Sequence, residues 1–264
     1  MKHAFLALAL AAGFGCVAVY PEVGTQLHSA VQGQRLDPPP PDDLRWVKFV
    51  SARVPEKTRD GRPWHTAFGK LPDPYAKLFV NGTELVRSPV QTETLTPTWP
   101  NGPHGNFKIG DGDKVRVELW DANPINDQPI GVREFGRITR ENLEDRKIDV
   151  ELEGGAEIRI ALEPAHAMSG LGLWYELRTT SVFITRMLDD SPAKRAGILP
   201  GDEVVALAGK PVKSLNADEV RSLFNAVPFD GLALGLRHAS GARLDVKLKE
   251  GPIYPPFDQF GSVD

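Results

Sequence analysis

The chain is poor in cysteine and in metal-binding patterns. Cys16 is the single cysteine among its 264 residues, so an internal disulfide is excluded. The six histidines are scattered and form no His-x-x-x-His pair, and no Cys-x-x-Cys pair exists, which argues against a zinc site. With 41% hydrophobic residues, the chain has room for two domains, each with a modest core.

Long hydrophobic runs, dense basic runs and catalytic signatures are also absent. The apolar run at residues 4–12 is too short to span a bilayer comfortably. The net charge of -4 and the lack of a Lys/Arg-rich run argue against nucleic acid, because a duplex binder needs a concentrated basic face. The sequence lacks the Gly-x-Ser-Gly turn of trypsin-like proteases, and no phosphate-binding glycine-rich loop precedes a helix. We therefore expect a protein that is not an enzyme.

The first 15 residues, MKHAFLALALAAGFG, combine a basic start, an apolar run and small residues, which is the pattern of a signal peptide. The segment GFGC at 13–16 resembles the cleavage box of bacterial lipoproteins, in which the cysteine becomes the lipidated N-terminus. By that resemblance Cys16 is acylated, and the protein is exported and anchored to a bacterial membrane, at the periplasmic face or the cell surface. An ordinary signal peptide with an incidental cysteine fits the same residues.

Residues 16–44 have weak periodicity and end in the run DPPPPDD at 37–43. Because a proline run is extended and semi-rigid, we interpret residues 16–44 as a tether ahead of the folded part. A plain disordered spacer is the alternative.

Residues 45–165 are strand-like. The segments WVKFVSARV, YAKLFVNG, KVRVELWD, KIDVELE and AEIRIALEP have apolar residues at alternate positions or are rich in β-branched residues. No long helical stripe interrupts them, and glycine and proline are frequent at the turns. This pattern predicts an antiparallel β-sandwich.

Motifs in this part of the chain resemble those of a C2-type domain. They are DPYAK at 73–77, TETLTPTW at 92–99, and VELWD at 117–121 with PIG at 129–131. The resemblance implies an eight-stranded antiparallel sandwich with a candidate calcium site built from loop carboxylates. The candidate ligands are Asp60, Asp73, Asp121, Asn123 and Asp127. Asn123 stands where the family prefers Asp, and capping of turns by Asp73 and Asp121 is the alternative.

The most informative stretch lies in residues 167–251. It begins with GLGLWYEL at 170–177, in which two glycines let consecutive N–H groups turn towards one anion. A short helix opens at Ser191, a longer amphipathic helix spans 217–226, and two strands form a hairpin around 240–241. These features resemble a PDZ domain in the circularly permuted arrangement of bacterial proteins. The resemblance implies a partly open β-barrel with two helices, so the fold class is mainly β.

The resemblance also implies a peptide groove. A partner strand would add between the strand at 173–177 and the helix at 217–226. The N–H groups of Leu171, Gly172 and Leu173 would bind the carboxylate of a chain end. The other predicted peptide-binding residues are Trp174, Asn216, Val220, Leu223 and Phe224. The alternative is a tight turn beside a closed groove.

Residues 252–264 are predicted to be an extended tail. Together these features predict a non-catalytic envelope adaptor that binds extended peptides or protein C-termini and reaches the membrane through its lipid anchor. One alternative is a calcium-responsive phospholipid-binding protein that acts through the C2-type domain. The other is an accessory subunit of a secretion or proteolysis machine. Calcium is the one cofactor considered.

Overall fold

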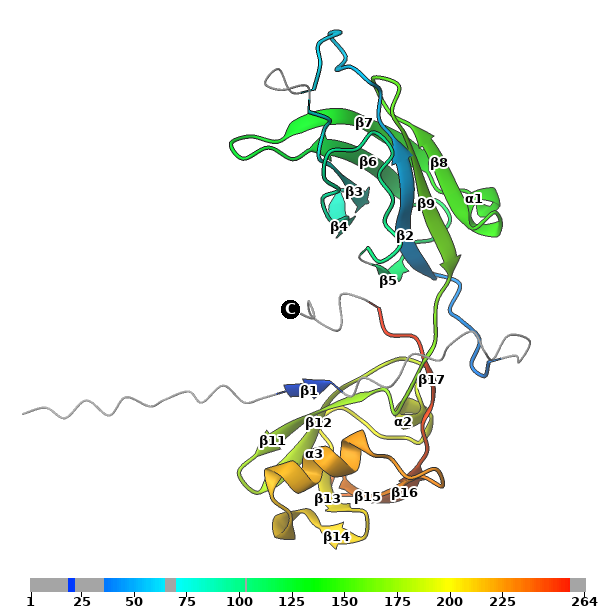
Figure 1. The fold of residues 1–264 in the computed structure, drawn as a ribbon. Coiled ribbons are helices and arrows are strands. Elements are labelled where there is room, and N and C mark those ends of the chain that lie inside the picture. The colour runs from blue at the N-terminus through cyan, green and yellow to red at the C-terminus, as the bar shows by residue number, and fades with distance from the viewer. Residues whose placement is uncertain (1–18, 22–35, 65–69, 103, 257–264) are drawn as a thin grey trace, which may run out of the picture. The chain divides into compact units, whose positions relative to one another are not determined.

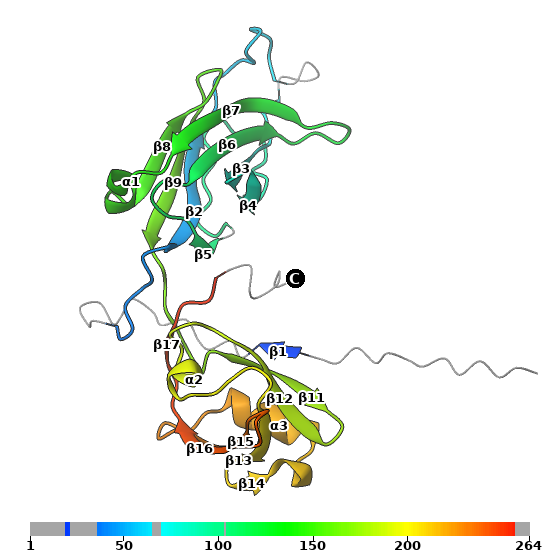
Figure 2. The same cartoon turned by 180° about the vertical axis from the view of Figure 1, so that it is seen from behind.

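The computed structural model describes residues 19–21, 36–64, 70–102 and 104–256. The predicted signal peptide, Cys16 and most of the predicted tether lie outside these ranges. The chain forms two compact units, whose elements are labelled in Figures 1 and 2. The sandwich unit consists of Val23–Gly170 with Gly251–Asp264, and the PDZ-type unit consists of Leu171–Glu250 with Met1–Glu22. No helix in the described ranges is long and apolar enough to cross a bilayer.

The sandwich unit contains two four-stranded antiparallel sheets, which confirms the predicted eight-stranded sandwich. The first sheet has the order β5-β2-β9-β8, with the bounds His104–Lys108, Leu44–Arg53, Glu157–Pro164 and Lys147–Glu151. The second has the order β4-β3-β6-β7, with the bounds Thr83–Arg87, Pro74–Val80, Lys114–Asp121 and Gln128–Arg137. A short helix, α1 (Arg140–Glu144), follows β7 and is capped by the Thr139 side chain.

The two sheets share one hydrophobic core, because alternate residues of each strand point inward. Val115, Val117 and Leu119 of β6 are fully buried and belong to the same cluster as the inward residues of β9. Trp99 fills this core, as expected, and its indole N–H donates to the Pro89 carbonyl at 2.8 Å. Burying each such side chain stabilises the fold by roughly 1.5–3 kcal/mol.

The PDZ-type unit is built on one antiparallel sheet with the order β1-β11-β12-β13-β15-β16, and β14 pairs with β13. The bounds of these strands in the same order are Val19–Pro21, Leu173–Arg178, Ser181–Met187, Glu203–Leu207, Leu232–Arg237 and Arg243–Leu248, with Lys210–Pro211 for β14. The helices are α2 (Pro192–Arg195), the 3-10 helix η2 (Val212–Ser214) and α3 (Ala217–Asn225). Two α-helices beside a β-sheet agree with the predicted fold class.

Both α-helices begin where the sequence predicts. Ser191 caps α2 by accepting a hydrogen bond from the Lys194 amide at 3.2 Å. Asn216 caps α3 by accepting from the Glu219 amide at 2.9 Å, and the Glu219 carboxylate accepts from the Asn216 amide at 2.8 Å. Phe224 on the buried face of α3 stacks on Tyr175 of β11, with ring centroids 4.2 Å apart. This contact holds the helix against the strand.

The residues after Glu250 begin with ordered structure. Strand β17 (Gly251–Ile253) pairs antiparallel with β10 (Met168–Gly170). The Tyr254 side chain is buried, and its hydroxyl donates to the Pro38 carbonyl at 2.9 Å. The start of the predicted tail is therefore extended, but it is packed within the sandwich unit.

The sandwich depends on a close backbone approach at Gly131 in β7. A Cβ atom at this position would lie 2.5 Å from the carbonyl oxygen of Glu153 and 2.8 Å from the Cβ atom of Leu152. We expect Gly131→Ala to lower the free energy of unfolding by about 2 kcal/mol, because the main chain has to shift. Gly110→Ala is the matched control, since nothing lies within 4 Å of its added Cβ. Urea denaturation followed by tryptophan fluorescence measures both, and equal effects would contradict the close approach.

Candidate functional site

The predicted peptide groove lies between β11 and α3 in the PDZ-type unit. One edge of β11 pairs with β12, and α3 is held against β11 by the Tyr175–Phe224 stack. The second edge of β11 is the one to which a further strand can add. The backbone N–H and C=O groups along such an edge offer hydrogen bonds that do not depend on the ligand's side chains.

The loop before β11 contains Leu171 and Gly172, which were predicted to bind a carboxylate. Gly172 has a φ of 71°, a conformation that glycine adopts without the cost of a Cβ atom. The Leu171 carbonyl accepts from the Ala193 amide at 3.0 Å, and the Gly172 carbonyl accepts from the Leu188 amide at 2.9 Å. The N–H groups of Leu171 and Gly172 donate to no acceptor within the described parts of the chain. The loop can therefore offer two N–H groups to a carboxylate.

The residues predicted to line the pocket for the last side chain come together in one hydrophobic cluster. Leu171, Leu173, Val220 and Phe224 are at most 2% exposed, and Leu223 is half-buried against them. Because Leu173 is a core residue, a charge at this position would unfold the domain rather than report on the groove. Leu223 is the member that a ligand can contact with little disturbance of the core.

Trp174 and Asn216 have structural partners of their own. The guanidinium group of Arg186 covers the Trp174 ring at 4.5 Å from its centroid. The Asn216 side chain caps α3, so its oxygen is engaged with the Glu219 amide. Both residues adjoin the groove, and each also stabilises the element that carries it.

A cavity of about 270 Å³ lies at the far end of β11, beside the start of α3. Asn216 and Val220 were predicted as site residues, but no local pattern indicated the other residues that line this cavity. These include Leu177, Ser181, Leu215 and Ala217. Only the folded chain brings the β11–β12 turn to the beginning of α3. The cavity extends the groove away from the Leu171–Gly172 loop.

The second edge of β11 is paired with the chain's own N-terminal segment. Strand β1 runs antiparallel to β11, with Val19 opposite Glu176, Tyr20 opposite Tyr175 and Pro21 opposite Trp174. Figure 1 shows β1, in dark blue, at the edge of the sheet that contains β11. This segment was expected to belong to the tether, because three residues that end in proline carry no strand signal of their own.

In the sandwich unit, four of the predicted calcium ligands share one hydrogen-bonded loop cluster. The buried Asp121 carboxylate accepts from the Asp73 amide at 2.8 Å, and the Asn123 amide group lies 3.3 Å from the other Asp121 oxygen. The Asp127 carboxylate accepts from the backbone N–H of Asn123 at 3.0 Å and from the Tyr75 hydroxyl at 2.6 Å. Burial and the neighbouring Asp127 carboxylate raise the pKa of Tyr75 to about 12.

The carboxylates of the cluster, and that of Asp60, accept hydrogen bonds from protein groups. The Asp73 carboxylate accepts from the Glu93 amide at 2.6 Å. Asp60 makes its contacts elsewhere, and hydrogen bonds from Arg62 and Thr58 lower its pKa to about 2. No group of three His, Cys, Asp or Glu side chains arranged to hold a metal ion is found in the described ranges. Calcium needs about six to eight oxygen ligands, and here the carboxylates serve protein N–H and O–H groups.

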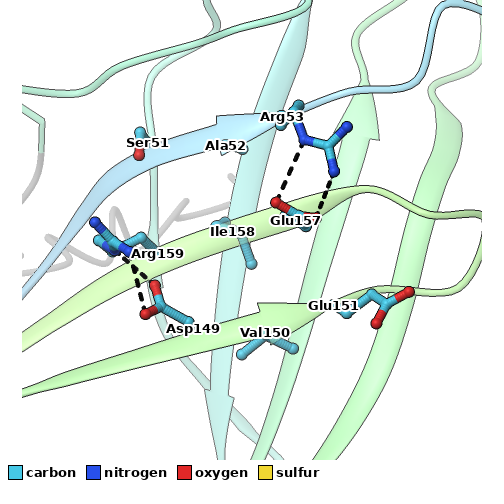
Figure 3. Close-up of a pocket in the computed structure, with 9 residues that line it drawn as sticks. All are labelled: Ser51, Ala52, Arg53, Asp149, Val150, Glu151, Glu157, Ile158 and Arg159. Atoms are coloured by element: carbon cyan, nitrogen blue, oxygen red, sulfur yellow. Dashed lines mark hydrogen bonds and ion pairs between the residues drawn. The ribbon is translucent and has the colours of Figure 1, made fainter.

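The outer face of β2, β9 and β8 has a depression of about 500 Å³, shown in Figure 3. Its charged side chains pair across the strands. Arg159 donates to Asp149 at 2.6 Å, and Arg53 forms an ion pair with Glu157. Both arginines are thus neutralised by carboxylates of the same surface, and these exposed pairs contribute little stability. With Glu151, the lining has two arginines and three carboxylates, an excess of one negative charge, and we assign no site to it.

The capping role of Asp121 leads to a stability prediction. Asp121→Ala leaves the Asp73 amide without its acceptor, so we expect the free energy of unfolding of the sandwich to fall by about 1–3 kcal/mol. The exposed Asp111→Ala serves as the control and should change it by less than about 0.5 kcal/mol. Thermal unfolding with and without calcium measures both effects. A melting temperature that rises with calcium in the unsubstituted protein, but not in Asp121→Ala, would indicate a metal site instead.

Comparison with protein families agrees with this division of the chain. A model described as C2 domain matches residues 47–149, and a model described as PDZ domain matches residues 183–227. The first range falls in the two-sheet sandwich, and the second contains α2 and α3 with most of β12.

Two curated relatives are bacterial proteases. The chain is 29% identical over 87 residues to the carboxy-terminal processing protease CtpA of Bacillus subtilis (strain 168), which is 33% of this chain and 19% of the protease. It is 31% identical over 85 residues to a probable CtpA-like serine protease of Staphylococcus haemolyticus (strain JCSC1435), which is 32% of this chain and 17% of that protein. The match spans less than a fifth of the length of either relative.

Solved C2 structures are also similar, at low identity. One titled as the structure of a C2 domain is 17% identical, covers 46% of this chain and 97% of its own, and gives a TM-score of 0.34. The paired C2 domains of Extended-Synaptotagmin 2 are 24% identical, with 49% of this chain and 44% of theirs covered and a TM-score of 0.36. Because these TM-scores are low, the C2 assignment rests on the family model and the sheet topology. The chain therefore carries a C2-like domain followed by a PDZ domain that resembles the one in CtpA proteases.

Proposed function

We propose that this protein is a non-catalytic adaptor that binds extended peptides or protein C-termini by adding them as a strand to β11. One observation carries the proposal: the edge of β11 accepts an antiparallel strand, as its pairing with β1 illustrates. A strand in this orientation runs towards the loop that contains Leu171 and Gly172. That loop has two N–H groups for the carboxylate of a chain end.

Affinity and specificity arise from different parts of the groove. Main-chain hydrogen bonds to β11 supply affinity for any extended segment. The half-buried Leu223 selects for an apolar side chain near the ligand's end. The cavity lined by Leu177 and Ala217 accommodates a residue further upstream. The adaptor would thus recognise short motifs rather than folded surfaces.

The likeness to the CtpA proteases favours a second candidate, an accessory subunit that recruits cargo for proteolysis. The shared part is about a third of this chain and less than a fifth of the proteases, so it supports a substrate-binding role and not the cleavage itself. This candidate uses the same groove. Binding of a protease to the purified chain through a surface outside α3 and β11 would favour it.

Membrane attachment belongs to the proposal as well, and Cys16 is the residue that would carry it. Acyl chains on Cys16 would keep the groove close to partners in the bacterial envelope and raise their effective concentration. We expect labelled palmitate to be incorporated into the protein expressed in bacteria and to be lost entirely in Cys16→Ser. Labelling of that variant, or no labelling of either protein, would contradict lipidation.

Substitution of Leu223 tests the groove. Peptide display against the full chain, with libraries that have free or amidated C-termini, supplies a labelled peptide. We expect Leu223→Lys to weaken binding of that peptide at least about tenfold, because the charged side chain replaces the apolar contact with the ligand. A tenfold loss corresponds to about 1.4 kcal/mol of binding free energy. Ser222→Lys places the same charge on an exposed residue of α3, next to Leu223, and should leave the affinity within about threefold. Enrichment from neither library, or equal effects of the two substitutions, would contradict peptide binding in this groove.

A further inference from the structure

We infer that Val19–Pro21 is an intramolecular ligand of the peptide groove, so that a partner peptide binds only by displacing it. The inference rests on the proposed function, because it assumes that partners use the same edge of β11. Four observations carry it: the edge that is occupied, the direction of β1, the continuation of the chain beyond Pro21, and the shortness of the pairing.

The occupied edge is the one on which the groove depends. In the sheet order, β1 lies on one side of β11 and β12 lies on the other. A partner strand and β1 therefore need the same N–H and C=O groups of β11. Both cannot pair with them at once, so their binding is mutually exclusive.

The direction of β1 matches that of a ligand. The register places Val19 opposite Glu176 and Pro21 opposite Trp174, so β1 advances towards the beginning of β11. The Leu171–Gly172 loop lies immediately before that beginning. A peptide whose end carboxylate binds this loop while its body pairs with β11 has to run in the same direction. Strand β1 thus occupies the path of such a peptide.

The chain continues past Pro21, so this pairing uses no terminal carboxylate. Main-chain hydrogen bonds along β11 are then enough to hold an internal segment. The groove's ligands accordingly include internal extended segments, and a free C-terminus adds the interaction with the Leu171 and Gly172 amides.

The pairing is short enough to be displaced. Strand β1 pairs with Trp174, Tyr175 and Glu176, which are three of the six residues of β11. Successive N–H groups of a strand point to opposite edges, and Pro21 has no N–H, so only one of Val19 and Tyr20 can donate an amide hydrogen to β11. A partner that pairs along all of β11 makes more hydrogen bonds than β1 does. Because β1 belongs to the same chain, its own binding does not depend on protein concentration.

Proline substitution tests this inference. The double variant Val19→Pro, Tyr20→Pro removes both amide hydrogens of β1 and leaves the rest of the chain unchanged. The probe is a labelled, C-terminally amidated peptide of residues 17–23, VAVYPEV, added to the full chain. We expect it to bind the double variant at least about tenfold more tightly than the unsubstituted protein. The reason is that the apparent affinity of the groove equals its intrinsic affinity multiplied by the fraction of molecules in which β1 does not occupy it. Hydrogen exchange should accelerate at least about tenfold in the unliganded variant at those amides of Trp174–Glu176 that face β1, whereas the amides that face β12 should stay protected.

A conservative double variant provides the control. Val19→Ile, Tyr20→Phe keeps both amide hydrogens and the strand preference, and it should behave like the unsubstituted protein. Equal peptide affinity and equal exchange in the proline variant and the unsubstituted protein would overturn the inference. Failure of the probe to bind either protein would also overturn it. Exchange protection that grows with protein concentration would show pairing between copies, which contradicts an intramolecular ligand.

The display-selected peptide with a free C-terminus separates the inference from the proposed function. If it binds the unsubstituted protein and the proline variant with the same affinity, the proposed function stands and the self-ligand is wrong. If it binds the proline variant at least about tenfold more tightly, both stand. If no selected peptide binds even the proline variant, the proposed function fails and the inference fails with it.

Discussion

The need to pair both edges of β11 is the constraint on which the rest of this structure depends. A strand at the edge of a sheet exposes backbone donors and acceptors that have to be hydrated, paired within the chain or paired with a partner. In this protein β12 satisfies one side of β11 and β1 satisfies part of the other. The backbone groups that would make an exposed edge a liability are the groups that a partner strand can use.

The surroundings of β11 determine what the edge can bind. Helix α3 is fixed beside the strand by its capping box at Asn216 and by the Tyr175–Phe224 stack. The Leu171–Gly172 loop is fixed by hydrogen bonds from Leu188 and Ala193 to its carbonyls, which leaves its amides available. Rigid support of this kind lets a short peptide bind without the cost of ordering the groove.

The sandwich unit differs because its polar groups already have partners. Its loop carboxylates accept hydrogen bonds from Asp73, Glu93, Asn123 and Tyr75, and the arginines of its outer face pair with neighbouring carboxylates. Such a surface is well suited to structural support or to weak contacts. A divalent ion at these loops would have to displace several of these hydrogen bonds. The proposed function accordingly rests on the PDZ domain.

The sequence by itself determined the two folds and the loop and helices that flank the predicted groove. Alternation of apolar and polar residues in segments such as 114–121 is a local pattern. It predicts a strand with one buried face without any knowledge of where the opposite sheet lies. The glycines around Leu171 and the caps at Ser191 and Asn216 are equally local, so the loop and both helices could be expected. Strands β5 and β7 were not foreseen, because their exposed or glycine-interrupted residues lack that alternation.

Only the tertiary structure decided how these parts are used. The pairing of Val19–Pro21 with β11 joins segments that are far apart in the sequence, and neither carries a sign of the other. The commitment of Asp121 to the Asp73 amide depends on which loops meet, and so does the cavity between the β11–β12 turn and α3. Backbone periodicity is a property of neighbouring residues, whereas the occupancy of an edge or a carboxylate is a property of whichever groups the completed fold brings within hydrogen-bond distance.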